Sequence, residues 1–447
     1  MNLERLLRER EAANRPLRVG LIGAGKFGTM FLSQVARTPG MHLLAVADLD
    51  PDRARRALAE TGWPAERFAS TGPVQALADG GTWITDDGEA LIDADGLDVV
   101  IEATGVPEAG VRHALRCFER GRHVVMVNVE ADVLVGPLLA RRAAQAGVVY
   151  SLAYGDQPAL ICEQVDWARA AGLEVIAAGK GTLYMPEFHA STPDTIWDYY
   201  GLTAERAAQS GMNAKMFNSF LDGTKSGIEM AAVANATGLR PPSTGLAFPA
   251  VGTGELAAKL IPRADGGLLE GPGMVEVISS RGRDGSDLTD DLRWGVYVTF
   301  AAPSDYVERC FADYGLVTDA SGRYSALWRP YHLIGLELGI SVAWAGLLEM
   351  PTGTARGWTA DVVAVAKSDL DTGTELDGEG GYTVWGRLMP AGASLAAGGV
   401  PIGLAHGIRL KRPVEAGAMV RWDDVTAAPD SLALRLRREM EASLAPG

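Results

Sequence analysis

The stretch "VGLIGAGKFGTMFLSQVA", residues 19–36, constrains the fold more strongly than any other part of this chain. It begins with consecutive apolar residues that do not alternate with polar ones, which is typical of a strand buried on both faces in a parallel sheet. The residues that follow have apolar side chains at helical spacing. Gly23, Gly25 and Gly28 lie where the strand gives way to the helix. The stretch therefore predicts a strand, a glycine turn and a helix, and the turn either holds a dinucleotide or is merely tight.

The residues after this helix favour the dinucleotide. A second apolar strand, "MHLLAVADLD", ends at Asp48, roughly 20 residues beyond the last glycine, where a carboxylate can accept hydrogen bonds from a ribose. The three glycines would allow the turn, the approach of a pyrophosphate and close packing of helix on strand. The helix N-terminus would offer free N–H groups to the phosphates. The predicted contacts are Gly23, Ala24, Gly25, Lys26, Phe27, Gly28 and Asp48.

Further strands with polar or glycine residues at their ends repeat this pattern. "GLDVVIEATG" ends in Ala103, Thr104 and Gly105, "RHVVMVNVE" in Asn128 and Glu130, and "GVVYSLAYGDQP" in Asp156. Alternating strands and helices predict an α/β fold with a doubly wound parallel sheet, whose ligands bind at the carboxyl ends of the strands. We therefore add Ala103, Thr104, Gly105 and Asn128 to the cofactor contacts.

The choice between NAD and NADP rests on the residues around Asp48. A carboxylate there favours NAD, because it would repel a 2′-phosphate. "DLDPDRARR" also supplies Arg53, Arg55 and Arg56, whose guanidinium groups could pair with that phosphate or lie on a solvated helix face. The expected cofactor is NADP(H) or NAD(H), with Arg53 as the phosphate-binding candidate.

The middle of the chain carries candidate catalytic groups. "LEVIAAGKGTLYMPE" predicts a strand leading into a glycine turn that carries Lys180, and "GMNAKMFNSFLDGTKSGIEMAAVANATGL" predicts one long interrupted helix. Asn218, Asp222, Lys225 and Glu229 share one face of that helix. Small neighbours indicate a buried helix, so these polar groups need partners, and a bound ligand can be one. The alternative is an ordinary solvated face.

Lysines near a reacting carbonyl can stabilise an oxyanion and relay a proton. Lys180, Lys215 and Lys225 are the candidates, and His189 in "PEFHASTPDT" is a possible acid, base or phosphate contact. A long helix is expected from near Tyr331. At its start, a predicted anion-binding corner consists of Tyr324, Arg329 and His332, and the alternative is an arginine that caps a domain interface.

Composition limits the functional classes. The net charge of −15 argues against a nucleic-acid or anionic-membrane partner. Cys117, Cys162 and Cys310 are widely spaced, which predicts reduced thiols. The amphipathic "MNLERLLRER" is not a secretory signal, and no apolar run reaches the roughly 20 residues of a membrane span. We expect a cytoplasmic protein with a small-molecule substrate.

The composition changes after "MPTGTARGWTA". Two segments, "ADVVAVAKSDLDTGTELDGEGGYTVWGRLMP" and "PIGLAHGIRLKRPVEAGAMVRWDDV", each contain two short strands around an acidic, glycine-containing turn. They predict a small all-β unit of hairpins. Lys367 and His406 in this unit are expected to be structural.

With these motifs in place, the chain resembles a known group of enzymes. "NVEADVLVG", "YGDQPA", "AAGKGT", "FNSFLDGTKS", "PSDYV" and "RPYHLIGLELG" match the DXR-like group, similar in role to 1-deoxy-D-xylulose-5-phosphate reductoisomerase. The group belongs with the homoserine-dehydrogenase-like oxidoreductases, and the C-terminal part resembles a SAF-type β-clip domain. The resemblance implies a rearrangement of 1-deoxy-D-xylulose 5-phosphate and an NADPH-dependent reduction to 2-C-methyl-D-erythritol 4-phosphate.

We also expect roles for individual residues. Lys180 and Lys225 would polarise the carbonyl, Glu229 or Asp156 would handle protons or a metal, and Glu130 matches an acidic residue of the usual reductoisomerases. Lys215, Asn213, Arg329, His189 and Tyr324 would bind the substrate. The usual Asn-Lys pair is Asn128-Val129 here, and at "YGDQP" only Asp156 remains of an Asp-Ser-Glu metal set. Mg²⁺ or Mn²⁺ held by Asp156 and Glu229 is an option.

We expect three domains: a Rossmann domain at residues 1–155, an α+β catalytic and dimerisation domain at 156–355, and the SAF-like unit at 356–447. Two alternatives keep the fold: simple alcohol–aldehyde oxidoreduction, as in homoserine dehydrogenase, and a non-catalytic scaffold that senses nucleotide. Fold analogy suggests a homo-oligomer.

Overall fold

The chain folds into two compact units in the computed structural model, which describes residues 2–209, 212–426 and 430–444. Unit 1 comprises residues 1–160 and 333–355, and unit 2 comprises residues 161–332 and 356–447. Contacts therefore group residues 333–355 with the N-terminal part, although the sequence analysis assigned them to the middle domain. The division into three domains stays a prediction.

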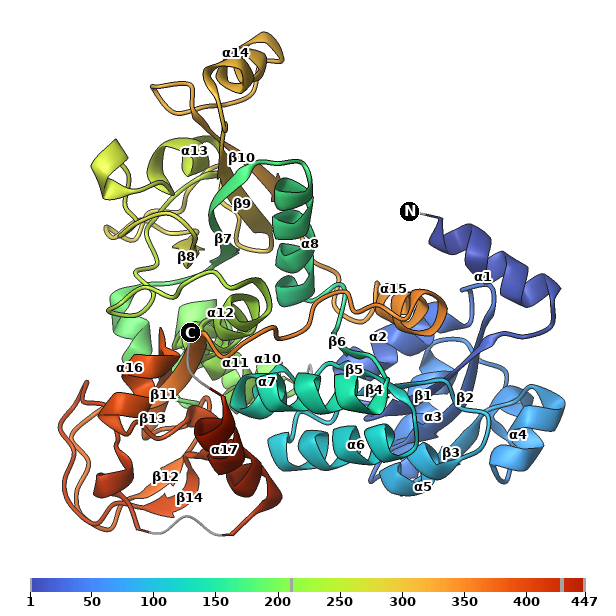
Figure 1. Cartoon of the computed structure of the whole chain (residues 1–447). Helices are drawn as coiled ribbons and strands as arrows, with labels where there is room; N and C mark the ends of the chain where they lie inside the picture. The colour runs from blue at the N-terminus through green and yellow to red at the C-terminus, as the bar shows by residue number, and fades with distance from the viewer. Residues whose placement is uncertain (1, 210–211, 427–429, 445–447) are drawn as a thin grey trace. The chain divides into compact units, whose positions relative to one another are not determined.

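Unit 1 is built on a six-stranded sheet in the order β3-β2-β1-β4-β5-β6 (Figure 1). Every neighbouring pair is parallel, and the order is that of doubly wound dinucleotide-binding folds, which confirms the predicted fold class. The strands are β1 (Leu17–Ile22), β2 (Met41–Ala47), β3 (Trp83–Thr85), β4 (Val99–Glu102), β5 (His123–Met126) and β6 (Tyr150–Leu152).

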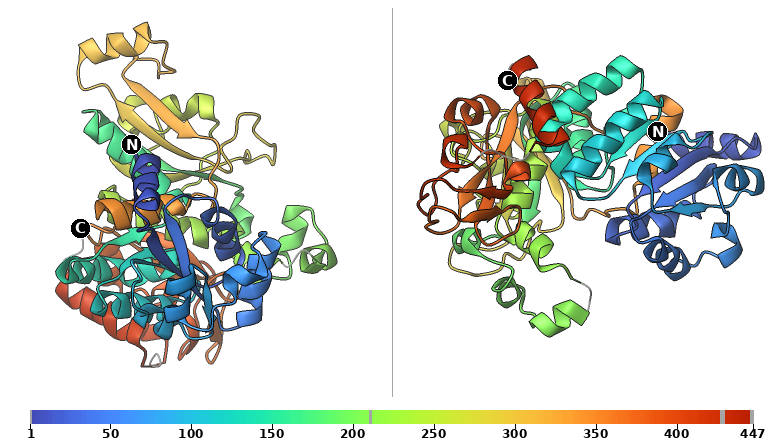
Figure 2. Two further views of the ribbon diagram at one scale, coloured as in Figure 1. Left: turned by 90° about the vertical axis from the view of Figure 1, so that its right-hand side faces the viewer. Right: turned by 90° about the horizontal axis from the view of Figure 1, so that it is seen from below.

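Helices cover both faces of this sheet (Figure 2). They are α1 (Leu3–Ala12), α2 (Lys26–Val35), α3 (Pro51–Glu60), α4 (Pro73–Asp79), α5 (Gly88–Asp93), α6 (Pro107–Glu119), α7 (Val129–Ala146) and α15 (Gly339–Ala343). One group consists of α5, α6 and α7, and a second contains α2, α3 and α15. Met1, at the start of the predicted N-terminal helix, lies outside the described residues.

The register of the sheet brings four strand ends together. Ile22 at the end of β1 is paired with Ala47 of β2 and with Glu102 of β4, and Glu102 is paired with Met126 of β5. The loops that follow these strands therefore start from one edge of the sheet, where the sequence placed the cofactor.

Unit 2 contains a four-stranded sheet in the order β10-β9-β7-β8. Its strands are β7 (Glu174–Thr182), β8 (Met274–Ser279), β9 (Val296–Ala301) and β10 (Tyr324–Arg329), and only β7 and β8 are parallel. The accompanying helices are α8 (Gln157–Ala170), which begins in unit 1, α9 (Ile196–Tyr200), α10 (Ala204–Gln209), α11 (Ala214–Leu221), α12 (Thr224–Thr237), α13 (Leu256–Lys259) and α14 (Asp305–Asp313).

Helix α12 is the core helix of unit 2. It packs on β7 and β8 on one side and on β11 (Ala360–Ala366) and β13 (Val384–Pro390) on another. Every one of its residues except Lys225 is buried. The predicted interruption is confirmed at Asp222 and Gly223, where Gly223 has φ +91°. The prediction of a buried helix is also confirmed, because small residues let two sheets approach it.

The C-terminal part of unit 2 is mostly β structure, but its strand pairing differs from the prediction. β11 pairs antiparallel with β13, and β12 (Glu375–Asp377) pairs antiparallel with β14 (His406–Arg409). β11 and β13 therefore pair within the first pattern, whereas β12, which lies between them in the sequence, pairs with a strand of the second pattern. The remaining helices are α16 (Ala391–Ala397) and α17 (Leu432–Ser443).

Two local predictions were wrong. No helix starts near Tyr331; α15 begins at Gly339, and a π-helix over Trp344–Leu348 follows it. Gly335 has φ +70°, and a Cβ there would lie 2.6 Å from the Phe27 carbonyl oxygen, so the chain crosses α2 in a non-helical conformation. Lys180 lies within β7 and not in a turn, because Gly179 and Gly181 allow the strand to continue in close contact with its neighbours.

Candidate cofactor and catalytic sites

The glycine turn after β1 is closely packed at two of its three glycines. Gly23 has φ +101°, and a Cβ there would lie 2.5 Å from the Ala103 carbonyl oxygen. A Cβ on Gly28 would lie 2.3 Å from the Gly23 carbonyl oxygen. These glycines let the turn contact β4 and let α2 contact the turn.

Gly25 differs, because a Cβ at this position would have no atom of the protein within 4 Å. It is the N-cap of α2, in an extended conformation and with no side chain capping the helix. The N-terminal N–H groups of α2 therefore have no side-chain cap, beside space that the protein leaves open. This arrangement fits the pyrophosphate of a dinucleotide.

The Asp48 carboxylate accepts hydrogen bonds within the protein that the sequence does not predict. Its Oδ2 accepts hydrogen bonds from the Ala24 N–H at 2.8 Å and from Arg53 Nε at 3.0 Å, and its Oδ1 accepts from Arg53 Nη2 at 2.6 Å. The Asp48 side chain is 0% exposed, whereas that of Arg53 is 52% exposed. Arg53 therefore covers the carboxylate expected to meet the ribose, and the face presented to solvent is a guanidinium.

The loop after β4 is held by a carboxylate that the sequence analysis overlooked. Thr104 Oγ1 donates a hydrogen bond to Glu102 Oε1 at 2.6 Å, and His113 Nδ1 lies 3.3 Å from the same oxygen. Glu102 is fully buried at the sheet edge that carries the cofactor turn. An ionisable residue ending the apolar run "DVVIE" was the available signal.

The remaining predicted groups of unit 1 lie at helix starts. Asn128 is buried, and its side chain accepts a hydrogen bond from the Ala131 N–H at 3.1 Å, so it caps α7. Glu130 lies in the first turn of α7 and is half-buried. Asp156 is buried just before α8, and its Oδ1 accepts from the Gln157 N–H at 3.0 Å.

Lys180 and Glu229 form a buried ion pair in unit 2. Lys180 Nζ donates to Glu229 Oε2, and the two side chains are 7% and 3% exposed. Alternation along β7 explains the placement: Gly179 and Gly181 face neighbouring backbone, where Cβ atoms would lie 1.8 and 1.9 Å from carbonyl oxygens, so Lys180 points the other way, toward α12. Burial of an ammonium and a carboxylate costs free energy that only close pairing offsets.

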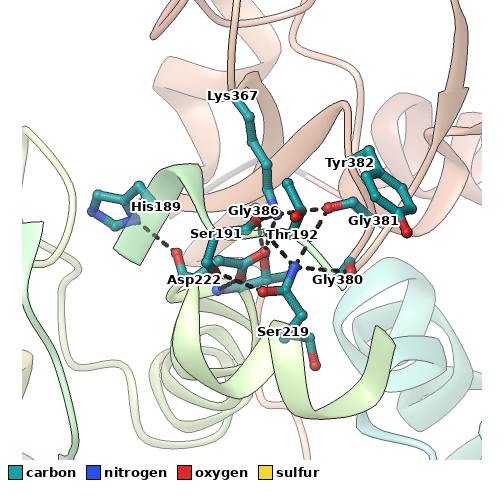
Figure 3. A network of polar contacts seen from close by, with 12 residues as sticks. His189, Ser191, Thr192, Ser219, Asp222, Lys367, Gly380, Gly381, Tyr382 and Gly386 are labelled. Atoms are coloured by element: carbon teal, nitrogen blue, oxygen red, sulfur yellow. Dashed lines mark hydrogen bonds and ion pairs between the residues drawn. The ribbon is translucent and has the colours of Figure 1, made fainter. Parts of the chain in front are cut away.

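A second network of polar contacts in unit 2 surrounds Asp222, between α11 and α12 (Figure 3). Asn218 Nδ2 donates to the carbonyl oxygens of Ser191 and Gly380 at 3.1 and 3.0 Å. Asp222 Oδ2 lies 2.8 Å from Lys367 Nζ, which also donates to the Ser191 and Gly381 carbonyls at 2.7 Å. Lys225 is half-buried. The polar side chains that were predicted to share one helix face therefore contact several different partners.

His189 is enclosed by hydrogen bonds. Its Nδ1 donates to the Asp222 carbonyl oxygen at 2.7 Å, which leaves Nε2 to accept from the Tyr184 hydroxyl at 2.9 Å. Burial lowers the pKa of His189 below its ordinary value. The ring is thus held neutral.

The predicted substrate contacts do not form one cluster. Lys215 Nζ donates to the Asp377 carbonyl at 2.7 Å, and Asn213 caps α11 by accepting from the Met216 N–H at 3.1 Å. Tyr324 and Arg329 occupy opposite ends of β10, so the strand separates them. The Tyr324 hydroxyl donates to Asp265 at 2.9 Å, and the Arg329 guanidinium lies 5.2 Å from the centre of the Tyr331 ring.

Some side chains with functional potential were not identified from the sequence. Trp385 and Arg387 lie two residues apart on β13 and line a cavity with His189 and Phe248. The alternation in "VWGRLMP" was the available signal, since it places the tryptophan and the arginine on one face.

Within the described ranges, no group of three or more His, Cys, Asp or Glu side chains is arranged to hold a metal ion. Glu229 is paired with Lys180. The three cysteines are free thiols. No described helix combines the length and the apolar character needed to span a bilayer.

Comparison with known proteins places these features in families. Residues 17–127 match the GFO/IDH/MocA family, described as "Oxidoreductase family, NAD-binding Rossmann fold", and residues 155–338 match "Oxidoreductase DRL, catalytic domain". A 4-hydroxy-tetrahydrodipicolinate reductase from Halorhodospira halophila is 31% identical over 168 residues, which is 36% of this chain and 57% of that protein. The chain thus spans little more than half of this relative.

Solved structures similar to part of the chain include a myo-inositol dehydrogenase from Lactobacillus casei in complex with NAD(H) and myo-inositol. It is 16% identical, with a TM-score of 0.29 over 41% of this chain and 50% of the other. A biliverdin reductase from Synechocystis in complex with biliverdin and NADP⁺ is 17% identical, with a TM-score of 0.26 over 38% and 48%.

The fold, the glycine turn and the family matches define an NAD-binding oxidoreductase. Residues 17–127 are thus similar to NAD-binding Rossmann domains of the GFO/IDH/MocA family, and residues 155–338 are similar to DRL-type oxidoreductase catalytic domains. The predicted class, an NAD(P)-dependent oxidoreductase, is confirmed, and so is the nicotinamide cofactor.

Proposed function

We propose that the protein reduces a carbonyl group of a small phosphorylated sugar or polyol with NAD(P)H, and that Lys180 and Glu229 are its central catalytic pair. The supporting observation is the buried ion pair between them, within the segment that matches an oxidoreductase catalytic domain. NAD(P)H, when bound, would supply the hydride that adds to the carbonyl carbon.

The task left to the protein is the charge that develops on the carbonyl oxygen. The Lys180 ammonium can stabilise this oxyanion and then deliver a proton from Nζ. Glu229 would hold the ammonium in place until the substrate arrives, because its carboxylate lies in direct contact with Nζ. Lys225, Lys215 and Arg329 remain candidates for binding the anionic group.

The more specific proposal is a reductoisomerase acting on 1-deoxy-D-xylulose 5-phosphate. It is supported by the motif resemblance to the DXR-like group, which includes the strand around Lys180 and the helices around Glu229. The β-clip assignment of the C-terminal unit, a divalent metal, a homo-oligomer and a cytoplasmic location also rest on that resemblance or on composition. The test is NADPH and NADH oxidation across ketose phosphates, free polyol-derived ketones and 4-hydroxy-tetrahydrodipicolinate, followed by NMR of the product. A product with an unrearranged carbon skeleton would exclude the reductoisomerase and would support simple carbonyl reduction.

Replacement of Lys180 tests the proposed catalytic pair. We expect Lys180→Met to lower kcat by about 10²–10⁴, the usual contribution of a positioned acid or base. Lys411→Met is the matched control, because Lys411 is an exposed lysine. Nucleotide binding should persist in both variants, since the glycine turn belongs to unit 1. A Lys180→Met enzyme with wild-type kcat would remove this residue from the mechanism.

A further inference from the structure

A cavity of about 240 Å³ lies within unit 2, where β13 meets the residues before α12. Its lining includes His189, Gly223, Phe248, Trp385 and Arg387. It is smaller than the roughly 300–1,000 Å³ of pockets that enclose drug-sized ligands, so it suits a small molecule.

The cavity is separate from the proposed catalytic pair. A Cβ on Gly227 would lie 3.1 Å from the Gly386 carbonyl oxygen, so this side of α12 faces β13, and Gly223, four residues earlier, lies on the same side. Glu229 is two residues further along and therefore about 200° around the helix, where it contacts Lys180 of β7. Helix α12 therefore lies between the cavity and the Lys180–Glu229 pair.

Arg387 provides the charge of the cavity. Among the described residues that line it, this is the one side chain that is ionised at neutral pH, and it makes no ion pair with any described carboxylate. Within the described residues its guanidinium makes a distant contact, from Nη2 to Met389 Sδ at 3.9 Å. Its stem packs on Gly245, where a Cβ would lie 3.1 Å from Arg387 Cγ. A half-buried guanidinium without a carboxylate is suited to an anionic ligand.

Flat aromatic groups form the walls. The rings of His189 and Trp385 stack with centroids 3.8 Å apart, and those of Phe248 and Tyr184 stack at 4.0 Å. The neutral state of His189 means that it brings no second charge.

One wall is held under backbone strain. Phe248 has φ +49°, which is rare for a residue with a side chain, and the loop is fixed from both sides. The buried Glu276 carboxylate accepts hydrogen bonds from the Ala247 and Phe248 N–H groups at 3.1–3.4 Å, and Arg283 Nη2 donates to the carbonyl oxygens of the same two residues at 2.9 and 3.0 Å. The protein thus maintains a strained conformation that keeps Phe248 in the cavity lining.

We infer that this cavity is a binding site for a small organic anion, which pairs its carboxylate with Arg387 and places a flat apolar body between the aromatic side chains. The site is distinct from the Lys180–Glu229 pair and does not depend on the proposed oxidoreductase reaction. Benzoate is a suitable probe, because it combines a carboxylate with a flat ring.

The test is calorimetric titration of the full chain with three compounds. Benzoate should bind at one site per chain. Benzamide, which has the same shape without the charge, and acetate, which has the charge without the ring, should each bind at least tenfold more weakly. Equal binding of benzoate and benzamide, or no binding of benzoate at 20 mM, would overturn the inference, and neither result needs a variant.

The variant arm uses Arg387→Met, which keeps the packing of the stem and removes the guanidinium. Charge-assisted hydrogen bonds contribute about 1.5–3 kcal/mol, so benzoate affinity should fall tenfold or more. Arg323→Met is the control, because it removes the same charge from an exposed residue of unit 2 that does not line the cavity. If Arg387→Met binds benzoate as the wild type does, the assignment is wrong. Oxidoreductase activity is measured in parallel, so that failure of this site and failure of the proposed reaction are told apart.

Discussion

At the scale of single residues, the contact between Arg53 and Asp48 decides what the cofactor meets beyond β2. The sequence offers a carboxylate that favours NAD and an arginine that favours NADP as competing signals. In the structure they are partners, because Arg53 donates two hydrogen bonds to Asp48. The negative charge is thereby compensated, and a half-exposed guanidinium faces solvent.

Replacement of Arg53 should therefore shift cofactor preference. We expect Arg53→Ala to lower the ratio of kcat/KM for NADPH to that for NADH by about tenfold or more, since a charged hydrogen bond is worth about 1.5–3 kcal/mol. Arg55→Ala on the same helix is the control, because Arg55 pairs with Asp52 at the surface. An unchanged ratio in Arg53→Ala would exclude this residue from phosphate recognition.

Asp132 gives a second prediction at this scale, on pH. Burial raises the pKa of Asp132 to about 7, against the single hydrogen bond from the Tyr150 hydroxyl. Between the ordinary pKa near 4 and pH 7, the folded state binds more protons than the unfolded state, so stability should fall as pH rises and level off above pH 7.

Asp132→Asn should reduce that slope in denaturant midpoints measured from pH 4.5 to 8. Part of the slope will remain, because burial also raises the pKa of Glu276 to about 7. A variant whose midpoints follow the wild-type curve throughout would contradict the assignment.

At the scale of elements, the strand–turn–helix unit separates folding from binding at neighbouring glycines. Gly23 needs a positive φ and has no room for a Cβ, whereas Gly25 has open space around its Cβ position. Gly23 is therefore needed for the conformation of the turn, and Gly25 for the space in which the ligand binds.

This difference predicts opposite results for two alanine substitutions. Gly25→Ala should keep the wild-type melting temperature but weaken nucleotide binding by tenfold or more, because the methyl group occupies the space left for pyrophosphate. Gly23→Ala should lower the stability of the fold by roughly 1–3 kcal/mol or more. Both variants are measured by thermal unfolding and by nucleotide fluorescence titration. Wild-type nucleotide binding by Gly25→Ala would contradict the assignment of this turn to the pyrophosphate.

At the scale of the whole molecule, the C-terminal helix α17 is held against β11, within unit 2, by a buried ion pair. Arg437 of α17 donates to Asp361 of β11 at 3.0 and 2.6 Å, and both side chains are 1% exposed. Ser394 Oγ donates to the same carboxylate at 2.6 Å, and the Arg437 guanidinium lies 4.9 Å from the centre of the Trp358 ring.

Loss of this arginine should be costly. We expect Arg437→Met to destabilise unit 2 by about 3–5 kcal/mol, because it leaves Asp361 buried without its counter-charge. The double variant with Asp361→Leu should recover much of that loss, since it removes the isolated charge. Chemical unfolding of the full chain provides the measurement, and a single variant as stable as wild type would contradict the expected role.

The sequence alone determined many of the local elements of this protein and the class of its first unit. Continuous apolar runs, helical spacing and the three glycines act over short distances along the chain, so the parallel sheet, the phosphate turn and the interrupted buried helix could be predicted from them. The tertiary structure decided which charged groups meet. Residues distant in sequence meet in the ion pairs of Lys180 with Glu229 and of Asp222 with Lys367. The same holds for the pairing of β12 with β14 and for the cavity lined by His189 and Arg387. Such contacts depend on how sheets pack around α12, which no local pattern encodes, because burial and pairing are properties of the assembled core and not of its segments.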